Sequence, residues 1–141
     1  AEPGTGTGVL SKNVISHANG FREDNLPLLD CVADMQVVFG RDTDGDGDFD
    51  SYTDNFFDPA FNPPLTASNI RDQLIEVRVY ILAHEGQYDR TYTFNNFTCG
   101  ANCVTVGEFG FGRNFDLSAI TNYLNYRWKL YTLVVKPNNL R

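Results

Sequence analysis

Residues 75–83 carry the clearest hydrophobic pattern of the chain. Apolar side chains occupy every second position, at Ile75, Val77, Val79, Ile81 and Ala83. The positions between them include the polar or aromatic residues Glu76, Arg78 and Tyr80. A period of two places the two sets on opposite faces of an extended chain. The pattern therefore predicts a β-strand with one face in the core.

Two further segments have strand patterns. Residues 32–39 alternate in the same way, with Ala33, Met35, Val37 and Phe39 on one face, and Gly40 ends the run. Residues 128–136 differ because apolar side chains occur on both faces of the extended chain. Since a strand that is apolar on both faces is typical of a sheet covered on both sides, this segment is predicted to be a central strand.

The remaining segments predict loops and short turns. Residues 1–27 show little periodicity and are predicted to be a loosely structured lead-in to a single globular head domain over 28–141. Residues 88–97 alternate weakly and are predicted to pair as a hairpin partner, and prolines in 56–64 indicate a packed loop. Ser68 or Asn69 is expected to cap a short turn, and Asp116 is expected to start another. The predicted fold class is α+β and mainly β, with an antiparallel sheet and long structured loops.

Length and composition agree with one soluble domain. The chain has 141 residues, of which 42% are hydrophobic and 21% are charged, a balance typical of globular proteins. Aromatic residues are plentiful, with 11 Phe and 7 Tyr, which favours β-structure. No apolar run reaches the length of about 18 residues that a membrane-spanning helix needs. The first residues also lack the cationic and apolar regions of a signal peptide.

The net charge of −7 comes almost entirely from one short segment. Six of the 18 acidic residues lie between 42 and 54, so the remaining twelve nearly balance the 11 lysines and arginines. The cationic residues are scattered and form no basic patch, which argues against nucleic acid as a partner. We interpret the local acidity as the surroundings of a bound cation.

The acidic segment has the ligand spacing of a calcium loop. From Asp42 the sequence reads D-x-D-x-D-G-x-x-D, and calcium takes six to eight oxygen ligands in flexible geometry. The predicted metal ligands are the side chains of Asp42, Asp44 and Asp46, the backbone carbonyl of Asp48, and Asp50 either directly or through water. Gly47 permits the sharp turn after the third carboxylate. Whether Asp54 also joins is left open.

This segment departs from a true EF-hand in two respects. Position 12 of the loop holds Thr53 where an EF-hand has a bidentate glutamate, and neither flank reads as a helix of useful length. We therefore predict an EF-like calcium loop outside an EF-hand. A solvated acidic turn is the plain alternative, because Asp and Gly are common turn residues.

No catalytic constellation accompanies the loop, and we predict that the chain is not an enzyme. The run from Asp42 to Gly45 resembles the nucleophile motif of haloacid-dehalogenase-like phosphatases, but the alternating α/β chain and further conserved groups of that fold are not evident. His17 and His84 are isolated, and neither a zinc-protease nor a nucleophile-elbow motif occurs. Asn96, Phe97 and Thr98 form a glycosylation sequon that matters only in a glycosylating host.

Three cysteines permit one disulfide and one free thiol. Cys99 and Cys103 flank a tight Gly-Ala-Asn loop, so a local bridge between them is one solution. Cys31 bridging either of them is the alternative, because sequence does not fix connectivity. Any such bridge would imply an oxidising compartment.

Several of these segments together resemble PilW-like minor pilins of bacterial type IV pili. The resemblance rests on a strand that runs into the D-x-D-x-D-G loop (residues 32–47), on the Val77-Arg78-Val79 strand and on the ending from 126 to 141. It implies a pilin-like antiparallel sheet and a structural, non-enzymatic subunit in a hetero-oligomeric filament with other pilin subunits. It also implies a calcium-stabilised head, with Asp42, Asp44, Asp46, Asp48 and Asp50 as the matching metal positions.

The same resemblance implies where the protein works. A pilus subunit is extracellular, at the cell surface, and is assembled from the bacterial inner membrane and periplasm. Pilins begin with a leader and a long apolar helix, which this sequence lacks, so contact with a membrane is expected only through a helix missing from this chain. Two alternatives stay open: a minor pseudopilin of a type II secretion system, and an extracellular calcium-dependent module for adhesion or carbohydrate binding.

Overall fold

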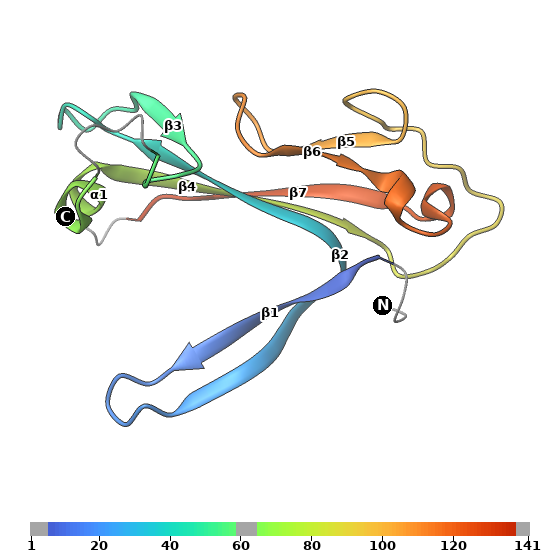
Figure 1. Cartoon of the computed structure of the whole chain (residues 1–141), viewed down its shortest axis with the longest axis horizontal. Helices are drawn as coiled ribbons and strands as arrows, with labels where there is room; N and C mark the ends of the chain where they lie inside the picture. The colour runs from blue at the N-terminus through green and yellow to red at the C-terminus, as the bar shows by residue number, and fades with distance from the viewer. Residues whose placement is uncertain (1–5, 59–64, 138–141) are drawn as a thin grey trace.

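The computed structural model describes residues 6–58 and 65–137, and these residues form two antiparallel sheets (Figure 1). The larger sheet has five strands: β1 (Gly8–Ile15), β2 (Arg22–Arg41), β3 (Ser51–Thr53), β4 (Leu74–His84) and β7 (Trp128–Val135). The smaller sheet pairs β5 (Cys103–Val106) with β6 (Arg113–Asp116). One α-helix, α1 (Ala67–Gln73), and two 3-10 turns, η1 (Leu117–Ala119) and η2 (Tyr123–Asn125), complete the described part. The prediction of a mainly β, antiparallel fold is confirmed.

The strand order of the larger sheet is β1-β2-β4-β7, and β3 pairs with the end of β2. Every neighbouring pair in this sheet is antiparallel. The first part of β2 pairs with β1 and the last part pairs with β4, where Met35 lies opposite Ile81. Both strands predicted from the alternating patterns, at 32–39 and 75–83, are therefore present, and β2 continues ten residues further toward the N-terminus.

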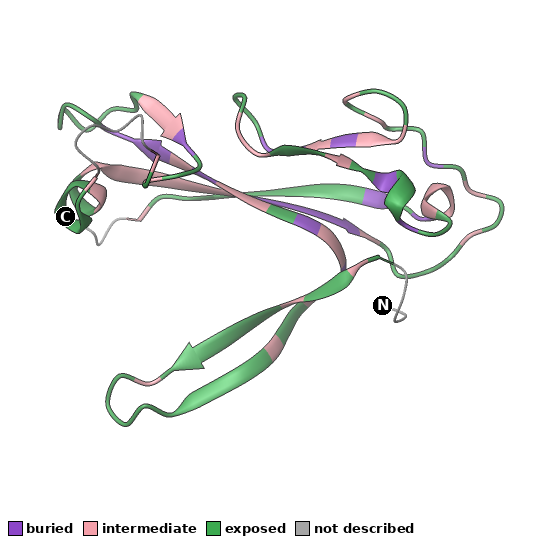
Figure 2. Cartoon of the chain, in the orientation of Figure 1, coloured by how far each residue is buried: buried purple, intermediate pink, exposed green. Residues whose placement is uncertain are grey.

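A two-stranded arm projects from the body of the molecule. It consists of β1, the turn after it and the first part of β2, over residues 8–31, and it stands clear of the other strands in Figure 1. Figure 2 shows that most of the arm is exposed on both strands. The expectation of a loosely structured segment before residue 28 is wrong here. A ribbon with no buried face needs no alternating pattern, so the sequence lacked the usual signal.

The core lies between one face of the larger sheet and the layer formed by β5, β6 and the 3-10 turns. Val38, Tyr80, Leu82 and Trp128 face this layer from the large sheet. The layer contributes buried residues that close the core from the other side, namely Phe94, Val104, Val106, Leu117, Ile120 and Tyr126. The helical turn predicted at Asp116 is present as η1, and the Asp116 carboxylate accepts a hydrogen bond from the backbone N–H of Ser118.

The opposite face of the sheet is apolar and has no such layer over it in the described part. We call it the open face and define it by nine residues that pair across three strands: Met35, Val37, Phe39, Val77, Val79, Ile81, Tyr131, Leu133 and Val135. Met35, Tyr131, Leu133 and Val135 are exposed, with relative exposures of 42–52%.

The prediction that residues 128–136 form a central strand is wrong. β7 ends the strand order, and every residue from Lys129 to Val135 is exposed. Its apolar side chains do lie on both faces, as the pattern indicated, but only Trp128 is buried. Apolar residues on both faces thus mark surfaces that the described residues leave uncovered.

Residues 88–97 form a connection and not a hairpin strand. The backbone N–H of Phe94 donates to the carbonyl oxygen of Leu124 at 2.7 Å, and that of Asp89 donates to Asn125 at 3.0 Å. These bonds direct Phe94 into the core, which accounts for the apolar positions without strand pairing.

Of the predicted packed loop at 56–64, Phe56 packs against Phe39 with ring centroids 4.5 Å apart, whereas Phe57 is exposed. Residues 59–64 lie outside the described residues.

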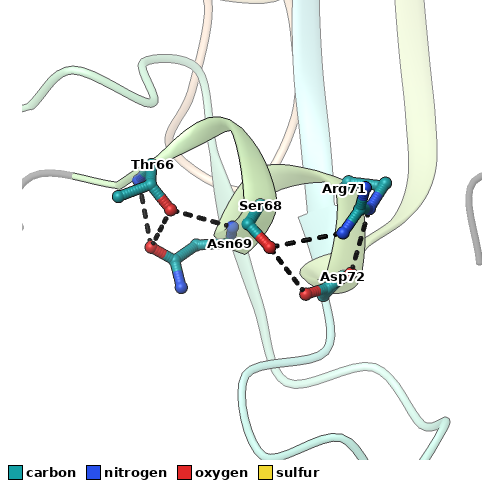
Figure 3. Close-up of polar contacts among 5 residues, drawn as sticks. All are labelled: Thr66, Ser68, Asn69, Arg71 and Asp72. Atoms are coloured by element: carbon teal, nitrogen blue, oxygen red, sulfur yellow. Dashed lines mark hydrogen bonds and ion pairs between the residues drawn. The ribbon is translucent and has the colours of Figure 1, made fainter.

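The helix α1 is capped by Thr66, two residues before Ser68, the nearer of the two expected caps (Figure 3). The Thr66 hydroxyl accepts the backbone N–H of Asn69 at 3.2 Å, and the Asn69 side chain accepts the backbone N–H of Thr66 at 3.0 Å. This reciprocal pair satisfies two of the N–H groups left free at a helix start. Within the described residues, no helix is long and apolar enough to cross a membrane.

Of the two disulfide solutions that the sequence left open, the local bridge is the one formed. Cys99 and Cys103 are joined, and Cys31 is a free, buried thiol.

Candidate metal centre

The acidic loop joins the end of β2 to β3, and backbone hydrogen bonds hold both of its ends. The N–H of Asp42 donates to the carbonyl oxygen of Gln73 at 2.8 Å, and the N–H of Asp50 donates to that of Arg41 at 2.9 Å. The Arg41 guanidinium also donates to the Gln73 side chain at 2.7 Å. The sheet therefore fixes where the loop starts and returns, while the loop itself reaches the surface.

Asp42 is the buried anchor of the loop, with a relative exposure of 1%. Its two carboxylate oxygens accept the backbone N–H groups of Gly45 at 2.7 Å and Gly47 at 2.9 Å. Both glycines have positive φ, 85° and 96°, which side-chain-bearing residues rarely adopt. The two glycines thus let the chain curl around the Asp42 carboxylate.

Asp50 closes the loop from its other end. Its carboxylate accepts the backbone N–H of Thr43 at 2.6 Å and the Thr43 hydroxyl at 2.7 Å. These hydrogen bonds, that of the hydroxyl first, lower the pKa of Asp50 because they favour its charged form. Asp50 is therefore held as a carboxylate at neutral pH.

Three of the five predicted ligands come together. One carboxylate oxygen each from Asp42, Asp44 and Asp50 lie within 4.8 Å of one another. Asp46 and Asp48 are exposed and are not in this group. Asp46 instead accepts the backbone N–H of Asp48 at 2.8 Å, an Asx-type turn along the loop.

The donor set suits a hard divalent cation. All three groups offer carboxylate oxygens, which calcium and magnesium prefer, and none offers the nitrogen or sulfur ligands typical of zinc. Three negative charges at this spacing repel one another, and a cation between them removes that repulsion. The irregular, glycine-bearing loop fits the flexible coordination of calcium better than the strict octahedron of magnesium.

Two residues that support the loop were missed in the sequence. Thr43 donates both of its hydrogen bonds to Asp50, and Gln73 reaches the loop from the end of α1. Thr43 sits at a variable position of the calcium-loop spacing, so the motif gives it no role. Gln73 is 31 residues away from Asp42 in the sequence, and only the β2–β4 pairing brings it near.

His84, the last residue of β4, packs as an aromatic residue against Tyr126 and against Trp128 of β7. Its ring lies 4.2 Å from that of Tyr126 and 4.8 Å from that of Trp128, measured between centroids. Burial lowers its pKa, and its Nδ1 lies 2.8 Å from the carbonyl oxygen of Glu85. These contacts give the residue a packing role at the end of β4.

Comparison with models of known protein families gives a match over nearly the whole chain. The model of the family PilW, described as Type IV Pilus-assembly protein W, matches residues 2–139, nearly the whole chain. No curated protein and no solved structure matches significantly.

Proposed function

Since this chain belongs to the PilW family of type IV pilus-assembly proteins, we propose that it is the head of a minor pilin, a structural subunit of the filament. The family is a non-enzymatic kind of protein, which agrees with the prediction that the chain is not an enzyme. In this proposal the chain binds other pilin subunits. It is located at the cell surface and is assembled there from the inner membrane and periplasm.

The open face is the observation that carries this proposal. Its nine residues are all apolar, and they cover neighbouring positions on β2, β4 and β7. Contiguous apolar surface of this kind marks an interaction site when it occurs on a folded protein. An enzyme or a small-ligand binding module has no need for such an uncovered apolar face, whereas a subunit buried in an assembly does.

We propose that an apolar helix of the pilin type covers the open face. A helix placed across the sheet would bury the four exposed residues, Met35, Tyr131, Leu133 and Val135, and complete the burial of the half-buried ones. Helix-on-sheet packing of this kind is the standard way to close one face of an antiparallel sheet. The proposal holds whether the helix belongs to the same polypeptide or to another subunit.

The proposed role of calcium is to stabilise the head. The three clustered carboxylates supply hard oxygen ligands at the point where β2 passes into β3. The carbonyl oxygen of Asp48 and water would fill the remaining positions, with Asp46 turning inward when the ion binds. A bound cation would fix the loop beside Tyr52, whose ring stacks on Phe109 at 4.2 Å. Calcium would thus link the larger sheet to the tip of the β5–β6 hairpin.

The decisive experiment is mass spectrometry of filaments sheared from the source cells. Recovery of peptides of this chain at low abundance relative to the main subunit is the expected result for a minor pilin. Recovery at high abundance would mean a head subunit that coats the fibre. Absence from the filaments, with the chain free in the medium or periplasm, would overturn the structural role.

A further inference from the structure

The outer edge of β7 is an open strand edge. In the part of the chain that the structure describes, β7 pairs with β4 on one side and with no strand on the other. Its exposed apolar side chains lie on both faces: Leu130 and Val134 on the core side, Tyr131, Leu133 and Val135 on the open face. Natural proteins avoid leaving an edge of this length and character bare, because it invites another strand.

A helix over the open face does not account for this exposure. Such a helix would cover Tyr131, Leu133 and Val135 and would leave Leu130 and Val134 exposed on the other face. A strand added beside β7 shields side chains on both faces at once and pairs the free backbone N–H and C=O groups. The exposure on both faces therefore points to lateral strand addition.

The arm presents the complementary element. β1 is the other end of the strand order and, within the described residues, pairs only with β2. Its exposed apolar residues include Val9, Val14 and Ile15, and the arm projects away from the body (Figures 1 and 2). A two-stranded ribbon by itself is marginally stable in water, and a third strand makes it more stable. The arm therefore needs a partner strand as much as β7 does.

The topology makes these two edges compatible. Each strand in the order β1-β2-β4-β7 runs antiparallel to its neighbour, so β1 and β7 of one chain run in opposite directions. β1 pairs with residues 22–32 of β2 and β4 pairs with residues 32–41, so β1 is displaced along the strand direction from β7. A second copy in the same orientation, shifted along the strands by this displacement, would continue the alternation, with its β1 antiparallel to β7. We propose that the chain associates head to tail with itself, β1 of one copy adding to β7 of the next.

The side chains support this pairing. Both strands have eight residues. Full antiparallel overlap places Leu10 opposite Leu133, Lys12 opposite Tyr131 and Val14 opposite Lys129. The two lysines thus do not face each other, and Lys129 already has a partner in Glu85 of its own chain at 2.7 Å. Pairing β7 with β7, or β1 with β1, would leave the other edge bare, whereas the head-to-tail contact pairs both.

A head-to-tail contact between unlike surfaces does not close into a dimer and allows growth into a chain of copies. This inference goes beyond the proposed pilin role, because it concerns contacts between copies of the head and holds without any other subunit. Its failure would leave the mass-spectrometry test of that role unaffected.

Sedimentation velocity over a concentration series tests the contact. Two variants place a lysine opposite a lysine across the proposed contact. Val14→Lys faces Lys129 and disrupts only the β1 edge of its own chain. Tyr131→Lys faces Lys12 and disrupts only the β7 edge of its own chain. Val14→Glu is the matched control at the same position, because it faces Lys129 with the opposite charge. Phe57→Lys is the control for an exposed apolar residue away from both edges.

The wild-type chain and both controls should show a weight-average sedimentation coefficient that rises with concentration beyond the dimer. Val14→Lys and Tyr131→Lys should each stay monomeric, and their equimolar mixture should form a 1:1 dimer and nothing larger, because only one intact β1 can meet one intact β7. Circular dichroism checks that each variant is folded. If Val14→Lys does not fold, Val9→Lys replaces it as the β1 variant, and if Tyr131→Lys does not fold, Leu133→Lys replaces it as the β7 variant.

Three results would overturn the inference. A wild-type chain that stays monomeric at every concentration has no such contact. Association that Tyr131→Lys abolishes and Val14→Lys does not would show β7 pairing with β7. A mixture of the two lysine variants that stays monomeric would show that the two edges do not meet.

Discussion

At the scale of single residues, Asp42 is the position on which the calcium proposal depends. At free calcium about 100-fold above the dissociation constant, binding would stabilise the fold by about 2.7 kcal/mol. For a domain of this size that corresponds to a fall in Tm of roughly 5–11 °C on chelation. In Asp42→Asn, which loses one buried ligand oxygen, we expect the difference in Tm between calcium and EDTA to disappear. Differential scanning calorimetry in both conditions measures it.

Asp48→Asn is the matched control for this substitution. Asp48 lies in the same loop, is exposed and would contribute only its backbone carbonyl, which the change leaves in place. The calcium-dependent shift should therefore survive in Asp48→Asn. A wild-type melting curve that does not respond to EDTA would contradict the calcium proposal at once.

The sequence located this candidate site but not its internal geometry. The spacing of the aspartates indicated the loop, and the structure brings Asp42, Asp44 and Asp50 together but not Asp46 or Asp48. The spacing does not tell which aspartate is buried, because Asp42 is held by a backbone hydrogen bond to Gln73, a residue distant in the sequence. Whether the loop binds calcium stays a prediction.

The ion pair between Asp34 and Arg113 is a second feature at this scale, and no pattern in the sequence indicates it. Two hydrogen bonds, of 2.6 and 2.9 Å, join the Arg113 guanidinium on β6 to the Asp34 carboxylate on β2. The Asp34 side chain is only 5% exposed. Removing the arginine would leave this carboxylate buried without its cation, a costly state.

We therefore expect Arg113→Met to lower the urea midpoint of unfolding clearly. Arg127→Met is the control, because Arg127 bonds Asp89 at 2.9 Å and also lies over an aromatic ring, but the Asp89 side chain is 32% exposed. Water can solvate Asp89 when the arginine is lost, so the control should change much less. Equal losses in the two variants would mean that the burial of Asp34 does not matter.

At the scale of elements, the β5–β6 hairpin depends on two glycines, Gly107 and Gly112, whose backbones approach too closely for a side chain. A Cβ atom on Gly112 would meet the carbonyl oxygen of Val106 at 2.2 Å, and one on Gly107 would meet that of Phe111 at 2.2 Å. Gly110, at the tip, has nearly the same positive φ as Gly112 but nothing within 4 Å of its Cβ position. Comparing an alanine substitution at Gly112 with one at Gly110 therefore separates the steric clash of a Cβ atom from the backbone cost of a positive φ.

Gly110→Ala should cost roughly 1–2 kcal/mol, the price of placing an L-residue in the left-handed region. Gly112→Ala should lower the stability considerably more, because the methyl group also forces the strands apart. Urea denaturation of both variants gives the comparison. If the two lose the same stability, the hairpin opens freely enough to accept the methyl group.

The elements with a buried face were predictable, and those without one were not. β4 and the second half of β2 have the predicted alternating pattern, but its strictly apolar positions lie on the open face. The face that packs on the core is the other one, through Val38, Tyr80 and Leu82. β7 shows apolar residues on both faces, and the pattern alone does not distinguish a strand covered on both sides from an exposed edge. The arm has no buried face at all, so its strands left no period in the sequence. A strand with no buried face therefore cannot be predicted from the spacing of apolar residues.

At the scale of the whole molecule, acid should destabilise the fold in two separate steps. Burial lowers the pKa of His84, so below the ordinary histidine pKa of about 6.5 the unfolded chain binds a proton that the folded chain does not. Stability therefore falls as the pH drops below about 6.5, until the folded histidine is protonated as well. The second step belongs to carboxylates whose pKa values are lowered by hydrogen bonds. Asp50, Asp116 and Asp89 accept them from Thr43, Ser118 and Thr91 respectively, and Glu85 accepts one from Lys129.

Stability from these carboxylates is present above their ordinary pKa of about 4 and is lost as the pH falls below it, because the unfolded chain then binds more protons. The urea midpoint measured between pH 8 and pH 3 should thus decline twice. His84→Gln should remove the upper step and keep the lower one, and His17→Gln, at an exposed position in the turn of the arm, should keep both. An upper step that persists in His84→Gln would mean that another group causes it, and that the packing of His84 against Tyr126 and Trp128 does not make the stability depend on pH near neutrality.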